Sequence, residues 1–372
     1  MAFQNWYLES QGLEIPLGKA NGDFYSTMLS LFGDSLSAQP PELMILTRRN
    51  DAEADQLSIA LGRRGHAVAR CNVEDLNNAT TLTIGVGEYG ASPSLRLGHV
   101  DRPHYNPRLV YIRHFDLDAL APAITKRSRG CEILNKYHRQ QWTAMTNALL
   151  HSGVEIIGLN AVRANDDRIR QITTAQHLGW ATPSTLVSNS TKDLRTFALA
   201  SPSGIIVKAL GSHFVEEPPQ LLNGYFPRIL RSRDAIRAIF DEQDQGFEPS
   251  PVLCQWFIPS HYEVRVYVAG TDTRAFQIKK ASHDNLWIDP EGTAAEFIDI
   301  GDETSRALVR LSQALGMDVA AIDLLYTEQG FVFLEANANG DWCWVESTTG
   351  SADVTAMHAK YLEGKIGEIS PQ

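Results

Sequence analysis

The chain has 372 residues, of which 43% are hydrophobic and 21% charged, a composition typical of ordinary soluble globular proteins. Its length predicts two or three domains, and its formal net charge of −11 argues against bulk nucleic-acid binding, so that local basic residues must meet any polyphosphate. The sequence shows no signal peptide and no apolar run long enough to span a membrane, and its four cysteines are scattered without a CxxC pair, so we expect a cytoplasmic protein without membrane insertion, disulfides or zinc.

The first part of the chain predicts a small α/β domain that follows an extension of mixed character at residues 1–40. Strand and helix patterns alternate here, and no GxGxxG motif follows the first strand, so a dinucleotide site is not expected and the domain is interpreted as a scaffold. The expected elements, in order, are a strand at 43–47, a helix at 52–64, strands at 67–71 and 108–115, a helix at 131–151 and a strand at 154–160.

Residues 165–183 predict a helix that begins at the cap residues Asn165 and Asp166 and ends at Gly179, before Pro183. Arg168 and Arg170 fall in its first turns, where a positive charge opposes the helix dipole. A bound anion would explain one of these arginines, and a solvated helix face would explain either equally well.

The apolar strand at 204–210 carries Lys208 near its end, beside a turn that contains Gly211 and Ser212. A lysine in this position can meet a phosphate while the backbone N–H groups of the turn cover it. Lysine also extends harmlessly into solvent from many strand ends, so Lys208 alone leaves both interpretations open.

Residues 252–258 predict another apolar strand, after which Glu263 and Arg265 alternate with valines on one polar face. A turn and a return strand that ends at Lys280 follow. Glu263 and Arg265 would form either a structural ion pair or part of a site, and their place just before the hairpin described next favours the site.

The stretch from Val319 to Trp344 predicts a β-hairpin. Its two apolar runs flank a polar turn that ends in Gly330, which suits a three-residue loop with glycine in the left-handed conformation. In that register Thr327 pairs with Phe331, and further along the hairpin Asp323 lies opposite Glu335.

The predicted opposition of Asp323 and Glu335 indicates a metal site, because like charges across a sheet repel unless a cation lies between them. Asn337 falls on the same face, two residues after Glu335. Carboxylate and amide oxygens are hard ligands suited to magnesium that carries phosphate oxygens. The alternative, an acidic surface hairpin, is disfavoured because the flanking residues are apolar on both faces, as in a buried sheet.

With these motifs the sequence resembles the ATP-grasp ligases, and among them the peptide maturases that make graspetides, the microviridin-like peptides closed by side-chain ester or amide bonds. The resemblance covers about residues 130–365 and is most specific in FLEANANGDWCWVESTTG. The residues that match the maturase pattern there are Glu335, Asn337, Gly340, Trp342, Trp344 and Glu346. The chain departs from the pattern with Glu263 where many maturases have aspartate and with Arg168 where many have lysine.

The resemblance implies a mixed α/β and α+β architecture, the ATP-grasp fold, in which a Rossmann-like pre-ATP-grasp domain precedes two α+β subdomains that clasp ATP. The expected boundaries are residues 1–157 for the extension and first domain, 158–251 for the central subdomain and 252–372 for the C-terminal subdomain.

The resemblance also implies the site. Two magnesium ions would bind Asp323, Glu335 and Asn337. Arg265 would hold the transferring phosphate, with Lys208, Glu263 and Lys280 as the other catalytic residues. Expected ATP-binding residues are Arg168, Lys208, Gly211 and Ser212, and the strand residues Gln255, Trp256 and Phe257, which would receive adenine largely through backbone groups.

The function implied is activation of Asp or Glu side chains in a ribosomal precursor peptide, with its leader and core, as acyl phosphates that then close ester or amide cross-links. The runner-up is an ATP-grasp ligase that adds an amino acid to a protein or small molecule, and a third hypothesis is a nucleotide-binding module without catalysis. The Asp-Glu-Asn set argues against the third hypothesis, and the Trp-x-Trp pattern favours the first. A homodimer is left open.

Overall fold

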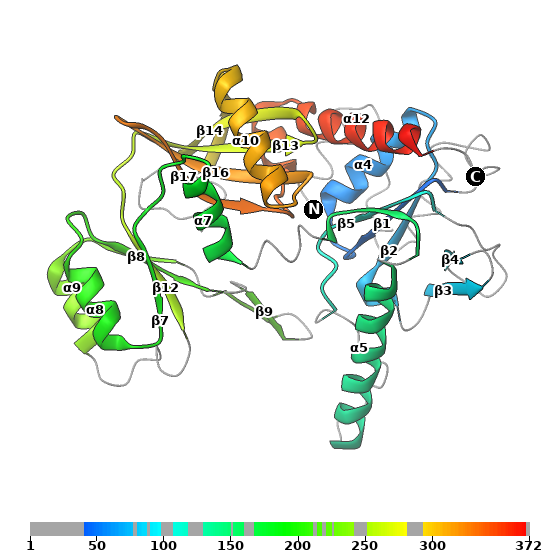
Figure 1. Ribbon diagram of the computed structural model, residues 1–372, viewed down its shortest axis with the longest axis horizontal. Coiled ribbons are helices and arrows are strands. Elements are labelled where there is room, and N and C mark those ends of the chain that lie inside the picture. The colour runs from blue at the N-terminus through cyan, green and yellow to red at the C-terminus, as the bar shows by residue number, and fades with distance from the viewer. Residues whose placement is uncertain are drawn as a thin grey trace. The chain divides into compact units, whose positions relative to one another are not determined.

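The computed structural model divides into two compact units (Figure 1), residues Met1–Asn160 with Asp341–Gln372 as unit 1 and Ala161–Gly340 as unit 2. It describes residues 41–76, 80–87, 90–97, 107–117, 129–149, 152–159, 167–210, 214–217, 221–224, 227–241, 251–280 and 293–369. The predicted three-part division stays a prediction, while residues 341–372, expected in the C-terminal subdomain, group by their contacts with unit 1.

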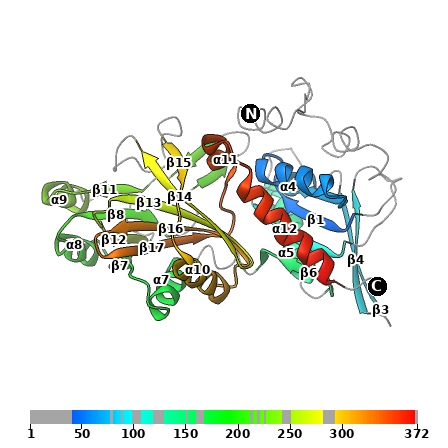
Figure 2. The same cartoon turned by 90° about the horizontal axis from the view of Figure 1, so that it is seen from above.

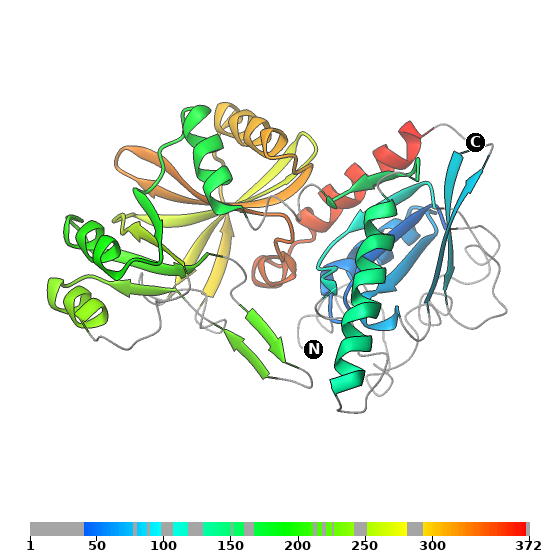
Figure 3. The ribbon, with the colours of Figure 1, turned by 60° about the horizontal axis from the view of Figure 1, so that its bottom comes forward.

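Unit 1 is built on a parallel sheet in the order β2-β1-β5-β6. The strands β1 and β5 are buried apolar runs, as expected of a parallel sheet covered on both faces. Figure 2 shows the helices α4 and α12 side by side over one face, and Figure 3 shows α5 on the opposite side. The elements of unit 1 are β1 (Leu43–Thr47), α4 (Ala52–Arg63), β2 (Val68–Asn72), the 3-10 turn η2 (Val73–Asp75), β3 (Thr80–Gly87), β4 (Gly90–Leu97), β5 (Leu109–Ile112), α5 (Arg129–Leu149), β6 (Glu155–Ile157), α11 (Cys343–Thr349) and α12 (Asp353–Glu368).

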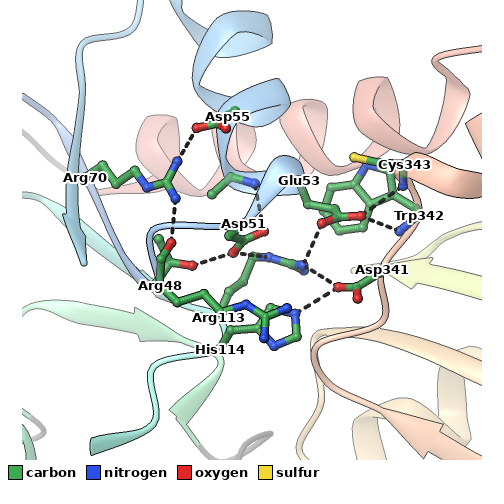
Figure 4. Close-up of polar contacts among 12 residues, drawn as sticks. Arg48, Asp51, Glu53, Asp55, Arg70, Arg113, His114, Asp341, Trp342 and Cys343 are labelled. Atoms are coloured by element: carbon green, nitrogen blue, oxygen red, sulfur yellow. Dashed lines mark hydrogen bonds and ion pairs between the residues drawn. The ribbon is translucent and has the colours of Figure 1, made fainter. Parts of the chain in front are cut away.

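A buried cluster of charges anchors α11 within unit 1 (Figure 4). The Arg113 side chain is fully buried, and its Nε lies 3.2 Å from Asp51 Oδ2. The Glu53 carboxylate of α4 accepts hydrogen bonds from the backbone N–H groups of Trp342 and Cys343, both at 2.9 Å. The first N–H groups of a helix lack partners inside the helix, so Glu53 caps α11 from another element.

The Trp342 side chain belongs to the core of unit 1. Its ring stacks on His358 with the centroids 4.2 Å apart, and its Nε1 donates to Thr355 Oγ1 at 2.8 Å. The guanidinium of Arg113 lies 4.7 Å from the centroid of the Trp342 ring. The first tryptophan of the Trp-x-Trp pattern is therefore explained by packing against α12.

One antiparallel sheet of unit 2 has the order β11-β8-β12-β7 and is covered on one face by α8 and α9 (Figure 1). The residues Val207 and Cys254 pack against these helices, so alternation turns Lys208, Leu253 and Gln255 to the opposite face. The elements are β7 (Thr185–Ser188), α8 (Thr191–Leu199), β8 (Ile205–Ala209), β11 (Arg228–Leu230), α9 (Arg233–Asp241) and β12 (Val252–Trp256), with a separate antiparallel pair of β9 (Phe214–Glu217) and β10 (Leu221–Gly224).

The other antiparallel sheet of unit 2 has the order β15-β14-β13-β16-β17. One face packs on α10 and α7 through residues such as Val266, Leu311 and Ile322, so alternation turns Arg265 and Asp323 to the opposite face. The elements are α7 (Arg168–His177), β13 (Tyr262–Ala269), β14 (Asp272–Lys280), β15 (Thr293–Phe297), α10 (Asp302–Ala314), β16 (Val319–Thr327) and β17 (Gly330–Asn337).

Most elements that the sequence predicts are confirmed, and one prediction cannot be compared. Helix α7 is capped by Asp167, whose side chain accepts from Arg170 N, and the predicted caps Asn165 and Asp166 lie outside the described residues. The cysteines form no disulfide bond; Cys71, Cys254 and Cys343 are buried, whereas Cys131 is partly exposed. Within the described ranges, no helix combines the length and apolar character needed to cross a membrane.

The buried carboxyl of Glu346 predicts a pH-dependent stability. Burial raises its pKa from 4.5 to about 7, against the lowering effect of hydrogen bonds from Thr355 N at 2.6 Å and Thr355 Oγ1 at 2.8 Å. Between these pH values the folded chain binds a proton that the unfolded chain has lost, so this group's contribution to the free energy of unfolding falls as pH rises. We expect Glu346 to lower the free energy of unfolding by at most about 3 kcal/mol as the pH rises from about 5 to about 8.

Chemical denaturation of Glu346→Gln across this pH range measures that contribution. The variant should lose the part of the slope that Glu346 causes, whereas Glu368→Gln, an exposed acid on α12, should keep the wild-type slope. An unchanged slope in Glu346→Gln would show that Glu346 titrates alike in the folded and unfolded chains.

Candidate active site

A bulge in the β16–β17 hairpin brings the two predicted metal carboxylates together. Thr327 pairs with Gly330, so the predicted three-residue loop is wrong and two residues form the turn. The register shifts by one residue between Asp323 and Leu324, and Asp323 then lies opposite Glu335 as predicted. In a bulge two residues oppose one, which explains why the adjacent residues Leu334 and Glu335 line the same pocket.

Asn337 connects the two carboxylates on the polar face of this sheet. Its Nδ2 donates to Asp323 Oδ2 at 3.2 Å and to Glu335 Oε1 at 3.1 Å. The side chains of all three predicted metal ligands therefore converge on one point.

Two arginines bind the same carboxylates. The Arg265 guanidinium forms a two-point fork on Asp323, with Nε to Oδ1 at 2.8 Å and Nη2 to Oδ2 at 2.9 Å. Arg168, at the start of α7, pairs through Nη1 with Glu335 Oε2. Of the two explanations that the sequence leaves open for Arg168, a solvated helix face is thereby excluded, since its side chain is mostly buried against this carboxylate.

The surrounding charges perturb the ionisation of both partners. Burial alone would raise the pKa of Glu335, but Arg168 and Lys208 overcome it and lower the pKa to about 2. Burial alone would lower the pKa of Arg265, but the Asp323 carboxylate outweighs it and raises the pKa. Glu335 and Arg265 are therefore charged throughout the physiological pH range.

A small pocket lies between the two sheets of unit 2, beside the carboxylates. Lys208 lines it from β8 and pairs in register with Leu253 of β12. The other lining residues are Ala209 and Gln255 from the same sheet, Arg168 and Ile172 from α7, and Leu334 and Glu335 from β17. The pocket thus combines cationic and apolar side chains.

The strand predicted to receive adenine is only partly oriented toward this pocket. Gln255 lines it and donates to Thr185 Oγ1 at 3.1 Å, whereas the Trp256 side chain points to α8, where its Nε1 donates to Phe197 O at 3.2 Å. The backbone N–H of Phe257 donates to Gly204 O at 2.8 Å, and that of Trp256 to a carbonyl at 2.9 Å. Both N–H groups already have protein acceptors, so adenine binding through them stays a prediction.

Of the remaining predicted residues, Glu263 and Lys280 form an ion pair. Lys280 Nζ donates to Glu263 Oε2 at 2.6 Å, and the lysine side chain is almost entirely buried. Lys280 therefore neutralises Glu263, while Arg265 binds Asp323. Gly211 and Ser212 lie outside the described residues.

Gln171 is a site residue that the sequence analysis missed. Its amide binds the backbone of Ala336 at both ends, with Nε2 to the carbonyl at 2.9 Å and Oε1 from the N–H at 2.9 Å. Ala336 lies between Glu335 and Asn337 on β17, which is the edge strand of its sheet. A glutamine on a helix gives no sequence signal for this role, because the helix period does not reveal which strand the residue faces.

Replacing Gln171 should loosen this edge. Gln171→Met keeps the length of the side chain but leaves the N–H and C=O of Ala336 without partners, which should cost about 1–3 kcal/mol of unfolding free energy. Hydrogen exchange at the Ala336 amide should also become faster than in the wild type.

Gln176→Met is the matched control, since Gln176 is an exposed residue of the same helix that donates to Thr182 Oγ1 at 2.8 Å. It should change stability little and leave exchange at Ala336 unaffected. If the two substitutions changed stability and hydrogen exchange at Ala336 equally, Gln171 would have no special role in holding the edge strand.

Comparison with known proteins shows which domain and which fold this chain is similar to. Residues 229–361 match the model of the RimK-like ATP-grasp domain. A probable alpha-L-glutamate ligase of Mannheimia succiniciproducens is 33% identical over 122 residues, which are 32% of this chain and 40% of that protein. The chain thus spans less than half the length of this relative.

Solved structures share the fold. The macrocyclase MdnC from Microcystis aeruginosa MRC, bound with its precursor peptide MdnA, superposes with a TM-score of 0.71 at 18% identity, covering 87% of this chain and 99% of that chain. The ATP-grasp ligase PsnB, complexed with a variant of its minimal precursor, Mg and ADP, superposes with a TM-score of 0.65 at 21% identity, covering 87% and 98%. The predicted ATP-grasp fold is confirmed. In its fold, and in the match of residues 229–361 to the RimK-like ATP-grasp domain, the chain is similar to the ATP-grasp ligases.

Proposed function

We propose that this chain activates Asp or Glu side chains of a ribosomal precursor peptide as acyl phosphates and closes them into ester or amide cross-links. The observation that carries the proposal is the pair of opposed carboxylates, Asp323 and Glu335, on a bulged hairpin surrounded by Arg265, Arg168 and Lys208. Phosphoryl transfer needs positioning and charge neutralisation more than covalent chemistry by the protein, and this arrangement offers both.

The donor set fits magnesium, which ATP-grasp ligases use with ATP. Asp323, Glu335 and Asn337 are hard oxygen ligands, and a flip of the Asn337 amide would present its oxygen where Nδ2 now lies, 3.1 and 3.2 Å from the carboxylates. Among the described residues no three His, Cys, Asp or Glu side chains converge, so water and phosphate oxygens would complete the coordination. Magnesium there would neutralise the charge on the phosphate oxygens, and two ions are proposed.

This small pocket is assigned to part of the ATP site. The apolar side chains of Ile172, Leu253 and Leu334 suit the base and ribose, and Lys208 with Arg168 suits the phosphates. Gln255, whose side chain lines the same pocket, is assigned to hydrogen bonding with the base.

The reaction follows in two balanced steps. An oxygen of the substrate carboxylate attacks the γ-phosphorus and forms an O–P bond, while the bond to the bridging oxygen breaks and ADP leaves. A hydroxyl or amine of the same peptide then attacks the acyl carbon, loses its proton and expels phosphate. Arg265 is assigned to the transferring phosphate, since a planar guanidinium binds it at two points. Glu263, hydrogen-bonded by Lys280 at 2.6 Å, is assigned to the proton of the attacking group.

A peptide substrate is supported by the similarity in fold to MdnC and PsnB, whose structures contain precursor peptides. The runner-up, ligation of a separate amino acid, is favoured by the relative named probable alpha-L-glutamate ligase. A nucleotide-binding module without catalysis is disfavoured, because a binder does not need opposed carboxylates.

Mass spectrometry separates these functions. Incubation with the cognate precursor peptide, ATP and Mg²⁺ should give products lighter by one water per cross-link, with one ADP released for each. The loss follows from the chemistry, because phosphate leaves with one carboxyl oxygen while the carboxyl group and the attacking hydroxyl or amine each lose one hydrogen. Mild alkali should then restore one water for each ester and leave amides intact.

Two glutamates of the same sheet provide a test variant and its control. Glu335→Gln should give no product while it melts as a folded protein, and Glu296→Gln, an exposed residue on β15 paired with Lys279, should keep full activity. A gain equal to an amino-acid residue would reject cross-linking in favour of the runner-up. ADP release without a covalent product would count against both.

A further inference from the structure

All four carboxylate oxygens of the predicted metal site already accept hydrogen bonds from positively charged or amide groups. Asp323 Oδ1 and Oδ2 accept from the two ends of the Arg265 fork. Glu335 Oε2 accepts from Arg168, and its Oε1 accepts from Asn337. A divalent cation must therefore compete with these donors for the same oxygens.

The charge balance of the site reinforces this competition. Three cations, Arg168, Arg265 and Lys208, act on the two carboxylates, so the site is already neutralised before any metal binds. Adding a divalent cation alone would place it close to two buried guanidinium groups, and interactions between buried charges are weakly screened. The polyphosphate of a nucleotide removes this repulsion, because its oxygens give the guanidinium groups new partners.

We propose that metal and nucleotide bind by exchange, in which Arg265 and Arg168 pass from Asp323 and Glu335 to phosphate oxygens as the divalent cation takes the carboxylates. This inference rests on the proposed function, because it assumes that these carboxylates bind the metal. Arg265 and Arg168 thereby make the binding of metal and the binding of nucleotide interdependent. The geometry favours Arg265 as the stronger competitor, since it holds both oxygens of its carboxylate and Arg168 holds one.

Linkage makes the exchange measurable. If the arginines oppose the metal and attract the phosphates, nucleotide must raise the affinity for metal, and metal must raise the affinity for nucleotide by the same factor. Replacement of Arg265 should strengthen the binding of metal in the absence of nucleotide. It should also reduce the factor by which nucleotide raises the affinity for metal. A residue that only stabilised the fold would not produce these opposite changes.

The probe is Mn²⁺, whose free ion is quantified by electron paramagnetic resonance, with and without a non-hydrolysable ATP analogue. Wild-type protein should bind Mn²⁺ weakly alone and on the order of tenfold to a hundredfold more tightly with the analogue. Arg265→Gln should bind Mn²⁺ alone about tenfold more tightly than wild type and gain less from the analogue. Arg168→Gln should show the same changes to a smaller extent.

Arg306→Gln is the matched control. Arg306 lies on α10 of the same unit, where its exposed side chain is 4.0 Å from Asp302, so the substitution removes one positive charge away from the carboxylates. It should leave both Mn²⁺ affinities unchanged. Arg265→Lys, which keeps the charge without the fork, covers the case in which Arg265→Gln does not fold, and its Mn²⁺ affinity without analogue should lie above that of wild type.

The outcomes distinguish the inference from the function beneath it. If wild type binds Mn²⁺ with the analogue but folded Arg265→Gln, Arg265→Lys and Arg168→Gln bind Mn²⁺ alone no more tightly than wild type, the exchange is wrong and the metal site stands. If wild type binds no Mn²⁺ even with the analogue, both the exchange and the proposed function are overturned.

Discussion

Repulsion between two carboxylates on one face of a sheet is the constraint around which unit 2 is organised. Asp323 and Glu335 lie opposite each other on adjacent strands, where like charges are destabilising unless they are neutralised. Three different elements supply that neutralisation, with Arg265 from β13, Arg168 from α7 and Lys208 from β8. Both sheets of the unit and the helix α7 therefore contribute to one electrostatic centre, which is also the place that we propose for a polyphosphate with its metal.

Much of this centre was predictable because strand alternation has a fixed period. The apolar runs of the hairpin located the strands, and alternation placed Glu335 and Asn337 on one face of β17 and Glu263 and Arg265 on one face of β13. The parallel sheet of unit 1 was predictable for a similar reason, since its strands are continuous apolar runs separated by a helical pattern. In both cases a local pattern of apolar residues was enough to locate the strands.

The rest depended on contacts between segments distant in sequence, which no local pattern encodes. The loop prediction was off by one residue, and the bulge at Leu334 restored the opposition that the loop alone would have lost. The role of Arg168 was left ambiguous and that of Gln171 was missed, because their partners on β17 lie more than 160 residues away in the sequence. The same holds for Trp342, which the resemblance counted as a maturase signature and which the structure explains by its contacts with His358 and Thr355.

A crystal structure with Mn²⁺ and a non-hydrolysable ATP analogue tests the central claim most directly, because anomalous scattering locates the metal without reference to the protein. We predict manganese peaks at coordination distance, roughly 2.0–2.4 Å, from carboxylate oxygens of Asp323 and Glu335, with the Arg265 guanidinium on the phosphates. Manganese bound elsewhere, with the Arg265 fork on Asp323 and the Arg168 pair on Glu335 both intact, would contradict the assignment of these carboxylates to the metal.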